Sequence, residues 1–249
     1  VSITYSNTVY VNNVIVRNNV GGSGPSTDGI DIDSSKNVLV ENCDVDCNDD
    51  NFCLKSGRDS DGLRVNIPTE NIVIRNCITG SGHGLITLGS ETSGGMNNIE
   101  IYGLKAVGTS NGFRLKSAKN RGGVMRNVWV HDVEMRDVEN PFSWELNWFP
   151  DYSYPNVPES IPKEEWPPHW FAMISPVEPP EKGIPEFHDM RISNVKITGA
   201  EQGLFAEAYP EKPIRNIIFE DVSIEAERGG IIKYARDWSM KNVRLDSKE

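Results

Sequence analysis

The amino-acid sequence predicts an all-β fold, a right-handed parallel β-helix, from three observations. Short segments with alternating apolar and polar residues recur along the chain, and this alternation is typical of half-buried strands. Gly, Asn, Asp and Ser cluster between the segments, and no long stretch has the apolar spacing of an amphipathic helix. The segments resemble one another at intervals of roughly 20 to 50 residues, the mark of a solenoid, and several strands per coil without helices favour a β-helix over a leucine-rich repeat, a propeller or a sandwich.

The chain starts with a strand-like pattern, "VSITYSNTVYVNNVIVRNN", and shows no signal peptide there. We therefore expect a mature or truncated part of a longer protein that lacks N-terminal coils. Because the ends of a solenoid normally need a cap, such a truncation would expose the apolar core of the first coil.

The repeated segment begins with Asn or Asp and continues with alternating apolar residues. The interval of 62 residues between Asn127 and Asp189 fits two coils or one coil with an insertion. Stacked coils would bury the inward Val, Ile and Leu side chains in one continuous core, so we expect residues 1–249 to form a single β-helix domain. We align the copies at Asn13, Asn37, Asn71, Asn98, Asn127, Asp189, Asn216 and, more weakly, at Trp238.

One region, residues 141–185, interrupts the repeats and is dense in Pro and Trp. Since Pro cannot donate a ladder hydrogen bond, we expect an inserted loop region that packs on the side of the solenoid. Its tryptophans argue against disorder, and they would serve either to stack on sugar rings or to attach the loop to the body. These residues are Trp144, Trp148, Trp166 and Trp170.

The amino-acid composition limits which binding partners and which cellular compartments fit this protein. The net charge is -11, from 25 Lys and Arg against 36 Asp and Glu, and this acidity argues against nucleic acid and anionic membranes as partners. No apolar run reaches the roughly 18 residues of a membrane span. We expect a monomer that is secreted or periplasmic, with any signal peptide removed or outside this sequence.

The four cysteines lie in the first third of the chain, and their spacing matches no zinc motif. The coil interval places Cys43 and Cys77 at equivalent points of neighbouring coils, about 4.8 Å apart. We expect a ladder of buried thiols, although a disulfide stays open, and we expect neither a metal site nor a cofactor.

Four polar clusters follow one another at about the coil interval. Residues that recur at this interval stack on one face of a β-helix, so that face would hold carboxylates, an imidazole and two cations. Each cluster alone has an ordinary explanation as a turn, a loop or a solvated face. The clusters are "STDGIDID" with Asp28, Asp31 and Asp33, "NDDNFCLKSG" with Asp49 and Asp50, "GSGHGLITLGSE" with His83, and "NGFRLKS" with Arg114 and Lys116.

The adjacent Asp49 and Asp50 pose a geometric question, because neighbours on a regular strand point to opposite faces. Both can serve one site only if the backbone is irregular between them. Their like charges favour keeping a proton on one of the two, which suits acid/base chemistry. We expect both at a strand edge, facing a groove shared with the other three clusters.

The order and spacing of these clusters resemble glycoside hydrolase family 28, the polygalacturonase family, whose motifs are Asn-Thr-Asp, Asp-Asp, Gly-His-Gly and Arg-x-Lys. The phrases "KSGRDSDG" and "GSETSGG" are similar to the bacterial, exo-acting branch. The resemblance covers most of the chain. It implies an inverting pectin hydrolase that cleaves α-1,4-galacturonosidic bonds, with a pectic polysaccharide or oligogalacturonide as substrate.

Position by position, the resemblance implies that Asp49 is the general acid, that Asp28 and Asp50 position and deprotonate the attacking water, and that His83 maintains the protonation state of the acid. Glycoside hydrolysis needs one protonated and one ionised carboxyl group, and neighbouring carboxylates split their pKa values in that way. Arg114 and Lys116 would bind the substrate carboxylate, with Lys55 and Arg58 as further candidate cations.

Two departures from the family pattern affect the edges of the site. Ser26 stands where the family has Asn, which would alter a substrate contact without removing the chemistry. A family tyrosine is expected near Trp148 or Tyr152, and neither residue is assigned its role.

Three alternatives remain open. A galacturonohydrolase directed at rhamnogalacturonan would use the same site. A pectate-lyase-like enzyme would bind Ca²⁺ through the aspartates, yet such a site needs six to eight oxygen ligands and gives His83 no part. A non-catalytic pectin-binding β-helix would use the same surface and tryptophans.

Overall fold

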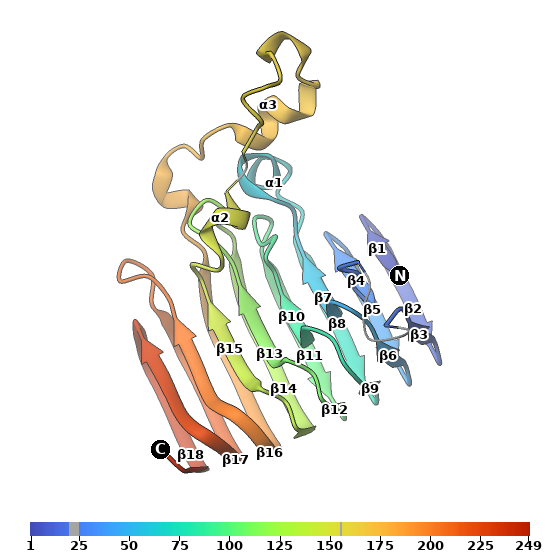
Figure 1. The fold of residues 1–249 in the computed structure, drawn as a ribbon, viewed down its shortest axis with the longest axis vertical. Helices are drawn as coiled ribbons and strands as arrows, with labels where there is room; N and C mark the ends of the chain where they lie inside the picture. The colour runs from blue at the N-terminus through green and yellow to red at the C-terminus, as the bar shows by residue number, and fades with distance from the viewer. Residues whose placement is uncertain (20–24, 155) are drawn as a thin grey trace.

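The computed structural model describes residues 1–19, 25–154 and 156–249, and it omits the side chain of Tyr152. Figure 1 shows the strands stacked side by side, with the two termini at opposite ends of the stack. Every described pairing is parallel and joins strands of successive coils. The predicted right-handed parallel β-helix is confirmed.

The strands form parallel rows within one sheet, and the later strands are longer because they run through the corners between rows. The first strands are β1 (Ser2–Thr4), β2 (Asn7–Asn12), β3 (Ile15–Arg17), β4 (Ile30–Asp33), β5 (Lys36–Glu41), β6 (Asp44–Asp46), β7 (Asp50–Lys55), β8 (Thr69–Arg75) and β9 (Ile78–Thr79). The others are β10 (Gly84–Leu88), β11 (Met96–Tyr102), β12 (Lys105–Val107), β13 (Asn111–Lys116), β14 (Val124–Arg136), β15 (Asn140–Glu145), β16 (Glu186–Glu207), β17 (Ile214–Lys233) and β18 (Ala235–Ser247).

The core consists of columns of inward side chains, one from each coil. In the row of β4, β7, β10, β13 and β15, one column runs through Ile30, Phe52, Ile86, Phe113 and Phe142. All five side chains are buried. Such continuous burial supplies the main stabilisation of the coils, since each coil alone could not bury its apolar face.

The repeated Asn marks a turn with left-handed backbone. Asn37, Asn71 and Asn98 have φ angles of 56°, 57° and 57°, a region that Asn tolerates better than most residues. Their side-chain amides also bond to one another, with Nδ2 to Oδ1 distances of 3.0 Å from Asn71 to Asn37 and 2.7 Å from Asn98 to Asn71. The sequence repeat therefore reflects a ladder of stacked amides.

The predicted alignment of the first repeat is wrong by one strand. Val9 pairs with Val38, so Thr8, with φ of 63°, occupies the position of Asn37. Asn13 precedes β3, which pairs with β6 in the next row. The error arose because the segments in both rows alternate apolar and polar residues after an Asn, and only the pairing distinguishes them.

The interval of 62 residues is one coil that carries an insertion, because β14 pairs directly with β16, with Val128 beside Met190. The predicted loop at 141–185 begins too early, since its first residues form β15. Trp144 is 0% exposed and packs against Phe113, Phe142, Phe219 and Trp238 in the core. Trp144 is therefore a core residue and does not stack on a sugar.

The rest of the insertion lies beside the short helix α1 (Asp59–Val65), at the end of the coils where β7, β10 and β13 finish (Figure 1). The Ser60 hydroxyl donates to the Ala172 carbonyl at 2.8 Å. The insertion contains α2 (Pro150–Ser153), η1 (Lys163–Glu165), α3 (Pro168–Ile174) and η2 (Pro180–Gly183). Among the described residues, no helix has the length and apolar composition to cross a membrane.

All four cysteines are buried free thiols. The Cys43 amide donates to the Cys77 sulfur at 3.4 Å, so these residues stack in neighbouring coils. The predicted thiol ladder is confirmed for this pair.

We predict that Trp144→Ala lowers the free energy of unfolding by about 3–5 kcal/mol, because it leaves a cavity among four aromatic rings. Equilibrium urea unfolding, followed by circular dichroism, measures the change. Trp129→Ala is the control, since Trp129 is 39% exposed on the outer face. Equal destabilisation by both variants would contradict the assignment of Trp144 to the core.

Candidate active site

The candidate site lies on the outward face of the row formed by β4, β7, β10 and β13. The register stacks Asp31, Cys53, Thr87 and Arg114 in one column on successive coils. Their sequence neighbours, such as Phe52 and Phe113, point into the core. The coil register thus gathers on one face the four clusters that are far apart in sequence.

Asp49 and Asp50 lie where β7 begins, and the backbone is irregular there. The side chains of Asp50 and Cys53 are on the same side, with 3.8 Å from Sγ to Oδ2, although residues three apart on a regular strand point to opposite faces. One carboxylate oxygen from each of Asp28, Asp49 and Asp50 lies within 4.8 Å of the others. The two adjacent aspartates therefore share one site, as the sequence predicted.

Asp50 is buried and ionised. It is 1% exposed, and Oδ2 lies 2.7 Å from the Lys116 ammonium, while Oδ1 accepts from Thr87 at 2.7 Å and lies 3.5 Å from Arg114. Burial raises the pKa of Asp50. The nearby charges of Lys116 and Arg114 lower it by more, so the pKa of Asp50 is below its usual value. Burial lowers the pKa of Lys116, but the charge of Asp50, its hydrogen bond to Lys116 and the neighbouring Cys53 together raise it by more, so the net pKa is above the usual value.

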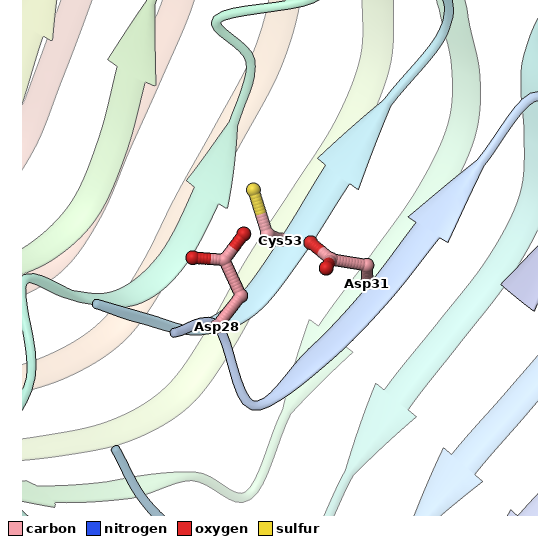
Figure 2. Close-up of side chains that lie close together, drawn as sticks. All are labelled: Asp28, Asp31 and Cys53. Carbon is pink, nitrogen blue, oxygen red and sulfur yellow. The ribbon is translucent and has the colours of Figure 1, made fainter. Parts of the chain in front are cut away.

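Asp28 is paired with Lys55, whose ammonium lies 2.7 Å from Asp28 Oδ2 and 2.9 Å from Asp31 Oδ1. Figure 2 shows the side chains of Asp28, Asp31 and Cys53 close together, with Cys53 between the two aspartates in this view. Burial raises the pKa of Asp31 to about 6, with Lys55 lowering it and Asp28 raising it. Burial likewise raises the pKa of the Cys53 thiol, which therefore stays neutral beneath the carboxylates.

Asp49 has different partners. Its carboxylate accepts from the Ser26 hydroxyl, and its Oδ1 lies 3.4 Å from His83 Nδ1. The His83 amide donates to the Asp49 carbonyl at 2.8 Å, which holds the two residues together across neighbouring coils. The His83 side chain is 58% exposed, so it lies at the surface of the site.

The two cations of the fourth cluster are largely buried, with Arg114 14% and Lys116 10% exposed in their side chains. The indole of Trp148 covers both, with 4.7 Å from its ring centre to Lys116 Nζ and 5.6 Å to Arg114 Cζ. Tyr152, the other candidate in this region, has its side chain outside the described part of the chain.

Arg58 has its described contacts outside the site, with residues other than Asp28, Asp49 and Asp50. Its Nε donates to Asp59 Oδ2 at 3.3 Å and its Nη2 to the Ser153 carbonyl at 3.3 Å. With Tyr154 and Trp170 it lines a cavity of about 420 Å³ between the body and the insertion. Arg58 thus helps to hold the insertion in place, and Lys55 is the one of this pair that contacts the aspartates.

The sequence did not reveal one side chain of the site, Thr87, or the roles of two others, Trp148 and Ser26. Thr87 bonds to Asp50, and Trp148, which was named without a role, covers the cations. Thr87 lies one coil after Cys53, so a strand-by-strand alignment would have revealed it. Ser26 was noted only as a departure from the family Asn, whereas its hydroxyl in fact contacts Asp49.

Within the described part of the chain, two groups of side chains have the spacing of metal ligands: Asp28, Asp31 and Cys53, and Asp28, Asp49 and Asp50. In both groups an amino or guanidinium group already neutralises carboxylates, through Lys55 or through Lys116 and Arg114. A neutral thiol is also a poor ligand for Ca²⁺, which prefers six to eight oxygens. The donor set therefore fits a calcium ion poorly.

Comparison with known proteins connects this geometry to a family. The family model described as glycosyl hydrolases family 28 matches residues 1–158. A probable polygalacturonase of Vitis vinifera is 29% identical over 201 residues, which is 80% of this chain and 36% of that protein. An endo-polygalacturonase of Pectobacterium parmentieri is 38% identical over 116 residues, or 47% of this chain and 27% of that protein. The chain thus spans about a third of the length of these relatives or less.

Solved structures agree on the fold. A hyperthermoactive exopolygalacturonase from Thermotoga maritima superposes with a TM-score of 0.81 at 25% identity, covering 99% of this chain and 49% of that one. The polygalacturonase from Erwinia carotovora gives a TM-score of 0.61 at 24% identity, over 94% of this chain and 55% of that one.

We predict that Lys116→Met lowers the free energy of unfolding at pH 7 by about 3 kcal/mol, because it leaves the Asp50 carboxylate buried with weaker compensation. In the unchanged protein the lowered pKa of Asp50 stabilises the fold above the unfolded pKa, and this stabilisation is lost as pH falls through the folded pKa. The variant should show the opposite trend and gain stability on acidification.

Urea unfolding of the variant between pH 4 and pH 8 measures this trend. The double variant Asp50→Asn with Lys116→Met is the control, because it removes both charges and should recover most of the lost stability. A Lys116→Met variant as stable as the unchanged protein at pH 7 would show that the pair contributes little.

Proposed function

The chain belongs to glycosyl hydrolases family 28, and from this premise we propose that it hydrolyses α-1,4-galacturonosidic bonds of pectin by acid/base catalysis. The substrate we propose is a pectic polysaccharide or oligogalacturonide. We also propose a monomeric protein that is secreted or periplasmic, where such substrates can reach it.

The single observation that supports this chemistry is that three neighbouring carboxylates, those of Asp28, Asp49 and Asp50, have different partners. Lys116 pairs with Asp50 and Lys55 pairs with Asp28, each at 2.7 Å, and the charge of Lys116 favours the ionised form of Asp50. Asp49 instead contacts a hydroxyl and an imidazole. Hydrolysis of a glycoside needs one protonated and one ionised carboxyl group close to the bond, and this arrangement can supply both.

In the proposed mechanism Asp49 protonates the glycosidic oxygen as the bond to the leaving sugar breaks. A water molecule near Asp28 and Asp50 attacks the anomeric carbon, and one of these carboxylates takes its proton. His83, beside Asp49 at the surface, exchanges protons with solvent and returns Asp49 to its acidic form. The carboxylate that accepted the proton from water, Asp28 or Asp50, releases it to solvent, so the site ends with the protons with which it began.

Arg114 and Lys116 would bind the carboxylate of a uronate sugar next to the cleaved bond. Because Lys116 already pairs with Asp50, the sugar carboxylate would share that ammonium, while Arg114 lies farther from Asp50 and has more freedom to bind. Lys55 would contribute mainly by holding Asp28. Arg58, at the edge of the insertion, remains a proposed contact for a more distant part of the substrate.

Exo action and inversion are the finer parts of the proposal. Exo action rests on the resemblance of "KSGRDSDG" and "GSETSGG" and on the insertion beside the site. Inversion rests on the family resemblance alone, because an oxygen separation within 4.8 Å is shorter than the roughly 6.5–9.5 Å of most inverting pairs.

We predict that Asp49→Asn lowers kcat on oligogalacturonides by about 10²–10⁴-fold while Kd changes little, because the variant loses the proton donor but keeps the cations. Release of reducing ends measures turnover, and calorimetry measures binding. Asp44→Asn, whose carboxylate pairs with Arg17 on the outer face, is the control. If the unchanged protein binds these chains without cleaving them, it is a binding module.

The reaction products distinguish exo from endo action, inversion from retention, and hydrolysis from elimination. We predict that the enzyme releases monomer from oligogalacturonides, and proton NMR of the first product should show the inverted anomer. A ladder of products would indicate endo action, and a retained anomer would contradict inversion. Ultraviolet absorbance of an unsaturated product, abolished by a chelator, would indicate the lyase alternative.

A further inference from the structure

One coil beyond Arg114 and Lys116, the outward face of this row of strands carries side chains of a different kind. The register places Ser143 and then Phe205 after Arg114, in the coils of β15 and β16. In the parallel column it places Glu145 and then Glu207 after Lys116. Two cations are therefore followed by a hydroxyl and a carboxylate, and then by an aromatic ring and a second carboxylate.

These side chains face outward on the same side as the candidate active site. Their chain neighbours Trp144 and Ala206 are fully buried in the core, whereas Glu145, Phe205 and Glu207 are half-buried. The strand spacing puts Glu145 and Glu207 about 4.8 Å apart. A sugar chain that continues past Arg114 and Lys116 would pass over them.

The local electrostatics disfavours a further negative charge. Burial raises the pKa of Glu145; Arg114 lowers it and Glu207 raises it again, with a net rise. Among the described contacts, the cation paired with Glu207 is Lys233 of the next coil, at 3.5 Å, and the Lys233 side chain is 52% exposed. A uronate carboxylate in this place would meet two neighbouring carboxylates in a partly desolvated setting.

The uncharged features of the same surface favour a different kind of sugar. The ring of Phe205 offers an apolar contact, and Ser143 offers a hydroxyl without charge. A methyl group, in an ester or on a deoxy-sugar, would pack against such a ring and lose no salt bridge. The two carboxylates and the apolar ring therefore both favour an uncharged sugar with a methyl group at this position.

We propose that the sugar bound one position beyond Arg114 and Lys116, on the side away from Asp49, is uncharged, either a methyl-esterified uronate or a neutral deoxy-sugar. Glu145 and Glu207 are the residues that determine this specificity, and Phe205 contacts the methyl group. The inference rests on the proposed function for the direction in which the sugar chain crosses the coils.

Binding to the Asp49→Asn variant tests the proposal without requiring turnover. The ligands are galacturonate trisaccharides that carry three carboxylates, or an uncharged sugar at one end, or an uncharged sugar in the middle. We predict that removing the charge at the end beyond the cations raises affinity about tenfold, whereas removing it from the middle sugar lowers affinity, because that sugar then loses the cations. A methyl ester and a deoxy-sugar at the favoured end distinguish the two sources.

In the Asp49→Asn background, Glu145→Gln with Glu207→Gln should abolish this preference by improving the binding of the fully charged trisaccharide. Glu134→Gln is the matched control, since Glu134 pairs with Lys105 in another row of strands. Equal affinities for all three ligands, or a preference that survives the double substitution, would overturn the proposal. Because calorimetry reports binding only, an absence of hydrolysis by the unchanged protein would contradict the proposed function and leave this test intact.

Discussion

Parallel pairing between successive coils is the constraint on which the rest of this structure depends. It places equivalent residues about 4.8 Å apart, so every outward or inward position becomes a column along the stack. Inward columns such as Ile30, Phe52 and Ile86 form the core. Turn positions form the ladder of Asn37, Asn71 and Asn98, where a left-handed backbone and amide hydrogen bonds both favour Asn.

The same constraint assembles the face that carries the candidate active site, but it cannot by itself bring Asp49 and Asp50 together. An irregular start of β7 does so, turning Asp50 outward while Phe52 remains in the core. Once outward and buried, Asp50 needs compensation, because an isolated buried carboxylate is very costly. Lys116, two coils away, supplies it. Lys55 acts in the same way for Asp28, so an acidic protein keeps its cations where carboxylates are most crowded.

The insertion adds a part of the site that the repeat does not contain. It attaches to α1 through Arg58 and Ser60 and places Trp148 over the two cations. Asp59, the first residue of α1, pairs with the fully buried Arg121, whose Nε also donates to the Ser90 carbonyl at 3.1 Å. This links the loops that follow β7, β10 and β13, so the support for the insertion comes from three coils.

The sequence by itself determined the fold class and the gathering of four polar clusters on one face, because both follow from periodicity. Alternation specifies strands, the interval between copies specifies coils, and motifs spaced by one coil must stack on one face. The sequence could not determine register, since an Asn followed by alternating residues occurs in two rows, and the first repeat was aligned one strand away from its true position. It also could not place Trp144 in the core or Arg58 against the insertion. Those outcomes depend on contacts between residues that no periodicity relates, and the pairing of Lys116 with Asp50 across two coils is of the same kind. Only the tertiary structure decided which cation neutralises which carboxylate, because that depends on distances of a few ångströms and on burial.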